Sequence, residues 1–367
     1  ELGPVYLYLP EGATPDLVAT AISGTVEAGI PLSMSQQGEV MVARSSNLDS
    51  KQRISLRSSF ANISVQRQGI EAPTPPTAPQ EGQPFKEVVT HEAVALDPVT
   101  LRVETIPGNI KLTGTDDTKV TVTATKLVRV NSQDNVRPAL QAMEVQLLPA
   151  DAGIISLRTS ALDVLSTLGC TSHRVDLEIK CPRAASIEIT TQDGQTFVSE
   201  MGGKIVVKQT AGAISVEHVK GEVDLTNAKG DITVASCAGP VTAAGSFGTI
   251  RLTDIFGKIA ITGNQAEAII ESPHAELQAR TTGGNIRIIS FEGIHGNYDV
   301  NVEQGNISIL LPPDSDASLS VTADNGVVQS SMPLTGNIKK DYQEFIKINS
   351  GPHRVTLQTK NGNIIID

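Results

Sequence analysis

The sequence predicts a mostly β protein: a parallel β-solenoid with 18-residue coils, preceded by a small α+β module. Three observations predict this fold class. Glycine or alanine returns at every ninth position between Ala185 and Gly284, and aliphatic residues recur at fixed positions after it. The eighth position of the repeat alternates in character, and a proline-rich segment separates the repeat region from the N-terminal segment at 1–70.

The nine-residue register describes a short strand followed by a turn. Aliphatic residues at the third and fifth positions alternate with polar ones, which is typical of a strand with one buried face. The glycine then suits a corner that needs a positive φ or a close approach of two backbones. The first positions are Ala185, Gly194, Gly203, Gly212, Gly221, Gly230, Gly239, Gly248, Gly257, Ala266, Ala275 and Gly284.

The eighth position doubles the repeat. One set of nonamers carries the apolar residues Met201, Val219, Cys237, Ile255, Pro273 and Phe291 there. Of these, Val219, Cys237 and Ile255 are predicted to lie buried and stacked in consecutive coils. The alternate set carries Gln192, Thr210, Ala228, Ser246, Asn264 and Thr282. Two strands with two unequal corners therefore form one 18-residue coil. A β-sandwich of hairpins is the alternative, but hairpins would not preserve a strict nonamer through six coils.

The repeat loosens on both sides of this regular core at 185–292. Residues 293–295 interrupt it, and it resumes at "GNYDV" and "GNISI". Further strands are predicted at "LRVETIPGNIKLTG", "KVTVTA", "VDLEI", "ASLSVTADNGVV" and "VTLQTKNGNIIID", with a short helix at "SALDVLSTL". The solenoid domain is thus predicted to span 85–367.

The segment at 1–70 reads as a separate module. "PVYLYLP" predicts a strand, and "IPLSMSQQGEVMVARSS" predicts a hairpin turning at Gln-Gln-Gly. "TPDLVATAI" predicts a helix, because Thr14 can cap it and Pro15 suits its first turn. Residues 71–84, "EAPTPPTAPQEGQP", predict a stiff extended linker.

The strings "VDLEIKCP", "GEVDLTNAKGDITV", "VTADNGVVQS" and "VTLQTKNGNIIID" carry a family resemblance. They resemble the bacterial putative-adhesin family of β-strand-repeat domains, over about residues 85–367. The resemblance implies a parallel β-helix-like body and a cell-envelope or extracellular location. It implies no catalytic residue.

Composition excludes some partners. The net charge of −11 argues against nucleic acid, which selects clustered Lys and Arg. No apolar run reaches the length of a membrane span, and no signal peptide opens the sequence. The absence of Trp and an aromatic content of 3% disfavour a stacking platform for sugars, although hydroxyl groups could still bind a glycan.

Metal and cysteine chemistry find little support. Calcium-binding nonapeptide rolls need Asp in Gly-Gly-x-Gly-x-Asp turns, and these corners lack it, so we expect no cofactor and no metal. The histidines show no ligand spacing; they are His91, His173, His218, His274, His295 and His353. Cys170 and Cys181 could pair if the chain doubles back between them, or remain thiols like Cys237.

Two function classes follow. The first is a non-enzymatic structural or adhesive protein, whose solenoid is a rigid scaffold for protein contacts or self-assembly. The second is a polysaccharide-active enzyme or glycan-binding module using one solenoid face. The candidate patch for such a face projects outward from one sheet and comprises Asp231, Arg251, Glu267, Glu271 and Arg287.

Self-association is the third hypothesis. Open strand edges can template another chain. The candidate residues are the aliphatic last strand and the apolar first strand: Ile364, Ile365, Ile366, Val5, Tyr6, Leu7, Tyr8 and Leu9. The alternative is that the first strand belongs to its own module and that earlier segments cover the last coil.

Overall fold

The computed structural model describes most of the chain in two compact units, which divide between Thr77 and Ala78. The described residues are 5–9, 16–22, 26–28, 33–37, 40–44, 53–59, 63–67, 84–95, 98–149, 153–313, 315–332, 344–348 and 352–367. The predicted linker at 71–84 therefore lies almost wholly outside them. No helix within these ranges is long and apolar enough to span a membrane.

The first unit contains two small sheets. Their strands are β1 (Val5–Leu9), β2 (Asp16–Ile22), β3 (Val26–Ala28), β4 (Ser33–Gln37), β5 (Val40–Arg44), β6 (Arg53–Ser59) and β7 (Ile63–Arg67). The strand order is β1-β7-β3 in one sheet and β4-β5-β2-β6 in the other. The predicted hairpin is confirmed, since β4 and β5 pair antiparallel from Gln37↔Val40 outward.

The predicted helix at 14–22 is wrong, because Asp16–Ile22 form strand β2. This strand is paired on both sides, antiparallel to β5 and parallel to β6. Leu17 and Ala19 are both fully buried, which is the two-residue period of a strand. The N-terminal capping signal is a local preference, and pairing with two neighbouring strands overrides it.

The second unit consists mainly of two long, largely parallel sheets, as expected for a β-solenoid. Sheet 1 has the order β30-β33-β28-β26-β24-β22-β20-β18-β16-β10-β14-β11-β8. Its strands are β8 (Phe85–Val94), β10 (Ile110–Thr115), β11 (Lys119–Val130), β14 (Cys170–Pro182), β16 (Thr196–Ser199), β18 (Ile214–Val219), β20 (Ile232–Cys237), β22 (Gly248–Ile255), β24 (Ala266–Pro273), β26 (Ile286–Ile289), β28 (Ile307–Leu310), β30 (Val328–Ser330) and β33 (Ile364–Ile366).

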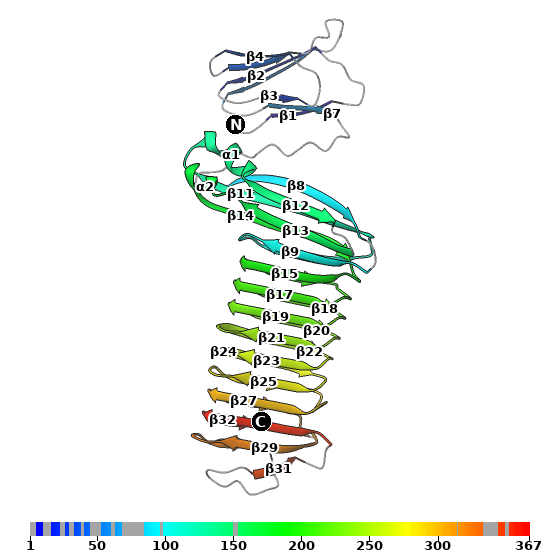
Figure 1. Cartoon of the computed structure of the whole chain (residues 1–367), viewed down its shortest axis with the longest axis vertical. Helices are drawn as coiled ribbons and strands as arrows, with labels where there is room; N and C mark the ends of the chain where they lie inside the picture. The colour runs from blue at the N-terminus through cyan, green and yellow to red at the C-terminus, as the bar shows by residue number, and fades with distance from the viewer. Residues whose placement is uncertain are drawn as a thin grey trace. The chain divides into compact units, whose positions relative to one another are not determined.

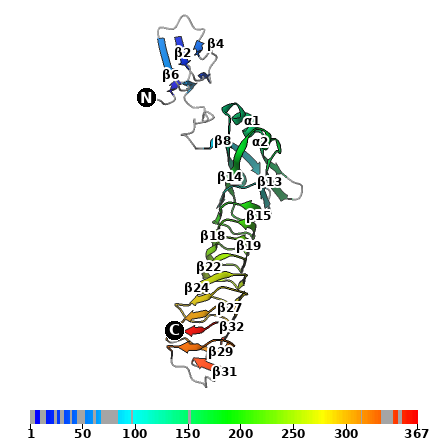
Figure 2. The same ribbon diagram turned by 90° about the vertical axis from the view of Figure 1, so that its left-hand side faces the viewer.

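Sheet 2 has the order β12-β13-β9-β15-β17-β19-β21-β23-β25-β27-β32-β29-β31. Its strands are β9 (Thr100–Thr105), β12 (Met143–Pro149), β13 (Ile154–Ala161), β15 (Ser186–Asp193), β17 (Ile205–Ala211), β19 (Val223–Lys229), β21 (Val241–Gly245), β23 (Ile259–Gly263), β25 (Leu277–Thr281), β27 (Tyr298–Gln304), β29 (Ala317–Ala323), β31 (Glu344–Ile348) and β32 (Arg354–Asn361). Figures 1 and 2 show the strands of both sheets stacked along one axis.

The core lies between the two sheets as stacked columns of aliphatic side chains. In sheet 2, Ile205, Val223 and Val241 are register partners on adjacent strands, each one coil further along the sequence. In sheet 1, Ile214, Ile232 and Ile250 follow the same spacing. All six are essentially fully buried. The inward side chains of each coil therefore pack between the two sheets and on the equivalent side chains of the neighbouring coils, as in repeat proteins.

The alternation at the eighth position has a backbone cause. Position seven has a left-handed φ in five of the six nonamers that carry an apolar eighth position, and the residues are Glu200, His218, Ser236, Asp254 and Ser272. This residue turns outward, so that the inward spacing changes from two positions to three. Val216 and Val219 then both point into the core. A repeated bulge thus explains why position eight is apolar in one corner.

The second corner of each coil, such as the turn between β17 and β18, requires glycine. Gly212 has φ +98°, and a Cβ there would lie 1.8 Å from the carbonyl oxygen of Gly194. Buried amides complete this corner: the side chain of Asn227 donates to the carbonyl oxygen of Gly212 at 2.7 Å, and that of Gln209 donates to Gly194 at 2.9 Å. These hydrogen bonds satisfy carbonyl groups that the turn leaves free.

The two ends of the solenoid are closed by segments out of chain order. The strands β9 and β10 lie between β13 and β15 and between β14 and β16, although they come earlier in sequence. At the other end, β32 lies between β27 and β29, as Figure 1 shows, and β33 lies between β28 and β30. The last coil in sequence is therefore not the last coil in space.

Antiparallel strands and short helices complete the ends. The strand β11 pairs antiparallel with β8 and β14, and β12 with β13. A 3-10 turn (Gln133–Asn135), α1 (Val136–Gln141) and α2 (Val164–Thr167) lie among them, and α2 confirms the helix predicted at "SALDVLSTL". The strand β31 ends sheet 2 antiparallel to β29.

Candidate functional site

The predicted patch lies on one sheet, as the register requires. Arg251 is on β22, Glu267 and Glu271 are on β24, and Arg287 is on β26, all in sheet 1. Asp231 immediately precedes β20 of the same sheet. Of these residues, Arg251 and Glu271 are in contact across neighbouring strands.

Polar contacts within the sheet engage two of the three carboxylates. The guanidinium of Arg251 forms an ion pair with Glu271, with 2.7 Å between Nη1 and Oε1. The second carboxylate oxygen of Glu271 accepts a hydrogen bond from the Thr253 hydroxyl at 3.2 Å. The carboxylate of Asp231 accepts from the backbone N–H of Thr249 at 2.8 Å. These groups hold neighbouring coils together.

The remaining patch residues are more widely spaced. Glu267 and Glu271 share a strand, so their backbones are roughly 13 Å apart, beyond the separation of a glycosidase carboxylate pair. Asp231 and Glu267 lie in the same column two strands apart, separated by about 9.6 Å of backbone. Arg287 is the register partner of Ile269 on β24.

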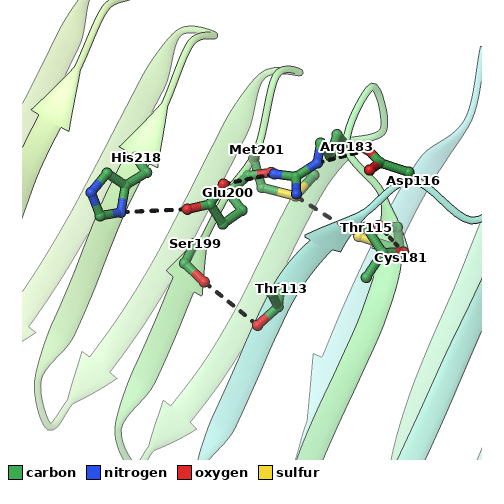
Figure 3. Close-up of polar contacts among 9 residues, drawn as sticks. All are labelled: Thr113, Thr115, Asp116, Cys181, Arg183, Ser199, Glu200, Met201 and His218. Carbon is green, nitrogen blue, oxygen red and sulfur yellow. Dashed lines mark hydrogen bonds and ion pairs between the residues drawn. The ribbon is translucent and has the colours of Figure 1, made fainter.

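A second charged cluster joins three separate parts of the chain (Figure 3). The guanidinium of Arg183 binds Asp116 at 2.9 Å and Glu200 at 2.7 Å. The opposite carboxylate oxygen of Glu200 lies 3.6 Å from Nδ1 of His218. The hydrogen bonds that Arg183 donates to Glu200, and secondly to Asp116, raise the pKa of Arg183.

The cluster around Arg183 was not visible in the sequence. Glu200 and Asp116 lie 17 and 67 residues from Arg183 in sequence. They meet because the out-of-order coil at this end places β10 beside β14. The one available signal is the 18-residue column, which puts Glu200 and His218 at equivalent positions of successive coils. All four charged groups are solvent-exposed, so the cluster is a surface feature.

The two strands predicted for self-association differ in their surroundings. The strand β1 is one of the two edge strands of its described sheet and pairs in parallel with β7. The strand β33 pairs in parallel with β28 on one side and β30 on the other, and Ile364 and Ile366 are fully buried. The premise that Ile364–Ile366 form an open end is therefore wrong, since earlier segments cover the last coil.

The sequence profile of Toastrack DUF4097 matches residues 4–367. The chain belongs to the Toastrack DUF4097 family. This match includes the N-terminal unit, which the resemblance in the sequence left unassigned. No curated protein matches the chain significantly.

Solved structures of bacterial proteins resemble the chain at low identity. One is described as a putative cell adhesion protein from Clostridium sporogenes, with 12% identity, 77% of this chain and 99% of that chain covered, and a TM-score of 0.21. Another is a putative adhesin from Bacteroides fragilis, with 14% identity, 77% and 97% covered, and a TM-score of 0.28. A third, from Parabacteroides merdae, has 10% identity, 76% and 96% covered, and a TM-score of 0.30.

The cysteines of this Toastrack chain are unpaired. Cys170 and Cys181 begin and nearly end the single strand β14, so they are roughly 36 Å apart. A disulfide needs Cα atoms within about 7 Å, and the chain does not double back between them. Burial raises the pKa of Cys181 to about 12 and also raises that of Cys237.

The histidines are less scattered than the sequence indicates. His274 and His295 lie with ring centroids 5.6 Å apart, and Glu292 approaches both. Phe291, the last apolar residue at the eighth position, is 68% exposed. Residues 293–295 insert into the coil at this point, and Ile294 enters the core instead.

Proposed function

We propose that the chain is a non-enzymatic structural or adhesive protein of the bacterial cell envelope or surface. The solenoid is its rigid scaffold, and the exposed faces of the two sheets make protein contacts. The observation that carries the proposal is the unbroken column from Ile214 through Ile232, Ile250, Ala268 and Ile286. A core that repeats coil by coil resists bending and leaves two long, exposed faces.

The use of charges on sheet 1 supports a contact surface over an active site. Glu271 is held by Arg251 and Thr253, and Asp231 by the backbone of Thr249. A general acid or base has to be available to a substrate proton. The patch instead presents a fixed pattern of charge, which suits recognition of a complementary protein surface.

The alternative is a polysaccharide-active enzyme or a glycan-binding module on the same face. The column shared by Asp231 and Glu267 supports it, since about 9.6 Å approaches the separation found in inverting glycosidases. The binding experiment with protease-treated cells and the assay on envelope polysaccharide distinguish this alternative from a protein partner.

Self-association is the other part of the proposal. With β33 covered on both sides, the first strand supplies the strand edge for pairing with another copy. The N-terminal residues involved are Val5, Tyr6, Leu7, Tyr8 and Leu9, which make up β1. Backbone hydrogen bonds along this edge would supply the contact.

Beads coated with the purified chain test these proposals. We expect them to bind intact cells of the source bacterium and to lose binding when the cells are treated with protease. The paired substitution Arg251→Ala with Glu271→Gln should weaken binding about tenfold or more, as for central contact residues. The matched control is Arg280→Ala with Asp299→Asn, which removes a similar cross-coil ion pair from sheet 2.

Each other outcome has a defined meaning. Binding that survives protease treatment of the cells indicates a glycan partner. Release of reducing ends from purified envelope polysaccharide, abolished by Glu267→Gln, overturns the non-enzymatic proposal. Equal loss in the two paired variants shows that sheet 1 is not the contact face. Clumping of coated beads with one another should disappear for a chain that begins at Glu11.

A further inference from the structure

The insertion at Gly293–His295 is the place where the regular core departs from its repeat. Strand partners elsewhere in this part of sheet 2 are one regular coil apart in sequence, as with Ile259 and Leu277. Tyr298, the next partner of Leu277, comes three positions later than this spacing requires. The extra residues bury Ile294 and place His295 at the surface, beside a histidine from the preceding coil.

The insertion brings together three side chains with metal-binding atoms. The donor atoms of His274, Glu292 and His295 all lie within 4.8 Å of one another. Glu292 lies between the two rings, with one carboxylate oxygen 3.9 Å from Nδ1 of His274 and 4.0 Å from Nε2 of His295. This is the one group of three such residues in the described part of the chain.

The surroundings hold the two histidines in place. The ring of His274 stacks on Phe256, with centroids 4.2 Å apart and planes 3° from parallel, and it is 18% exposed. The hydroxyl of Ser290 donates to the carbonyl oxygen of Gly293, which fixes the inserted loop. The buried Tyr298 donates to the carbonyl oxygen of Pro273 at 3.3 Å. Both ligand-bearing segments are therefore tied to the core.

We propose that His274, Glu292 and His295 bind one divalent transition-metal ion of the zinc class. Two imidazoles and a carboxylate are ligands that Zn²⁺ and its late first-row neighbours prefer, whereas Ca²⁺ and Mg²⁺ favour sites made of oxygen atoms. Metal bonds of about 2.0–2.2 Å require the donor atoms to close in on a common centre. Glu292 is 70% exposed, so its side chain can turn to complete the set.

The proposal goes beyond the scaffold role and does not depend on it. Three protein ligands leave one tetrahedral position for water or for a group from a partner. The site also joins a corner to the inserted loop of the next coil, so that bound metal would cross-link neighbouring coils.

Isothermal titration of the tag-free full chain with ZnCl₂ tests the site. All chains carry Cys170→Ser, which removes the half-buried thiol as a competing ligand. We expect one equivalent of Zn²⁺ to bind, and CaCl₂ to give no binding. His295→Ala and Glu292→Gln should each weaken Zn²⁺ binding by about tenfold to a hundredfold or more, because loss of even an outer-shell partner has effects of that size.

The matched control is His218→Ala. His218 also lies beside a glutamate, Glu200, but no second histidine completes that pair. This variant should bind Zn²⁺ like the parent chain. In NMR spectra, Zn²⁺ should shift the ring protons of His274 and His295 and leave those of His218 unchanged. No Zn²⁺ binding, equal affinity in the His295→Ala chain, or equal binding of Ca²⁺ would overturn the proposal.

Discussion

Val219→Asp is expected to unfold the central coils. Val219 is buried at the eighth position of its nonamer. It is the register partner of Cys237, and Cys237 is in turn the register partner of Ile255, so that the three residues form one column. A carboxylate there would be buried without a partner, so we expect the free energy of unfolding to fall by roughly 3–5 kcal/mol. Urea denaturation followed by circular dichroism measures the change.

The control for Val219→Asp places the same carboxylate on the outside. Ser236 is exposed in the left-handed column, where Asp254 occupies the equivalent position one coil later. Ser236→Asp should therefore change the stability by less than about 0.5 kcal/mol. If the Val219→Asp chain were as stable as the parent chain, the conclusion that the side chain at position 219 points into the core would be wrong.

Leu357→Asp is expected to release the far end of the solenoid. Leu357 is fully buried on β32, between Val300 of β27 and Val321 of β29. A charge there should separate the terminal coils. Because each coil contacts mainly its neighbours, the central coils should stay folded.

Hydrogen–deuterium exchange distinguishes this local loss from global unfolding. Protection should fall by a factor of about a hundred or more in 317–323 and 354–366, as a local opening predicts, and remain in 205–261. Lys360→Ala, an exposed change on the same strand, should leave all of these segments protected. Simultaneous loss of protection in 205–261 would show that the end coils are not a separable part.

The repeat predicted well those elements that depend on local pattern. Strands from β15 to β26 follow the nonamers, and Val219, Cys237 and Ile255 stack as the eighth position indicated. The patch residues lie on one sheet because the coil repeat returns Asp231 and Glu267 to one column and Arg251 and Arg287 to another. These features follow from short-range periodicity, which a single sequence contains.

The features that were missed depend on distant contacts. The helix expected at 14–22 is a strand because β5 and β6 both pair with it. The placement of β33 between β28 and β30 reverses the order of the last coils, and no local signal carries such an exchange. At the three-residue insertion, Ile294 is buried and Phe291 is 68% exposed, and the nonamer pattern contains no signal for this local arrangement.

The central claim is that the coils stack in one register, and thiol reactivity tests it most directly. Cys237 is fully buried in the corner column, Cys181 is buried near the end of β14, and Cys170 is partly exposed. Burial raises the pKa of Cys181 and of Cys237, so little reactive thiolate forms at neutral pH. In the native chain a maleimide reagent should label Cys170 first, while Cys181 and Cys237 react only as fast as the protein unfolds. Rapid labelling of Cys237 in the folded protein would contradict the stacked register.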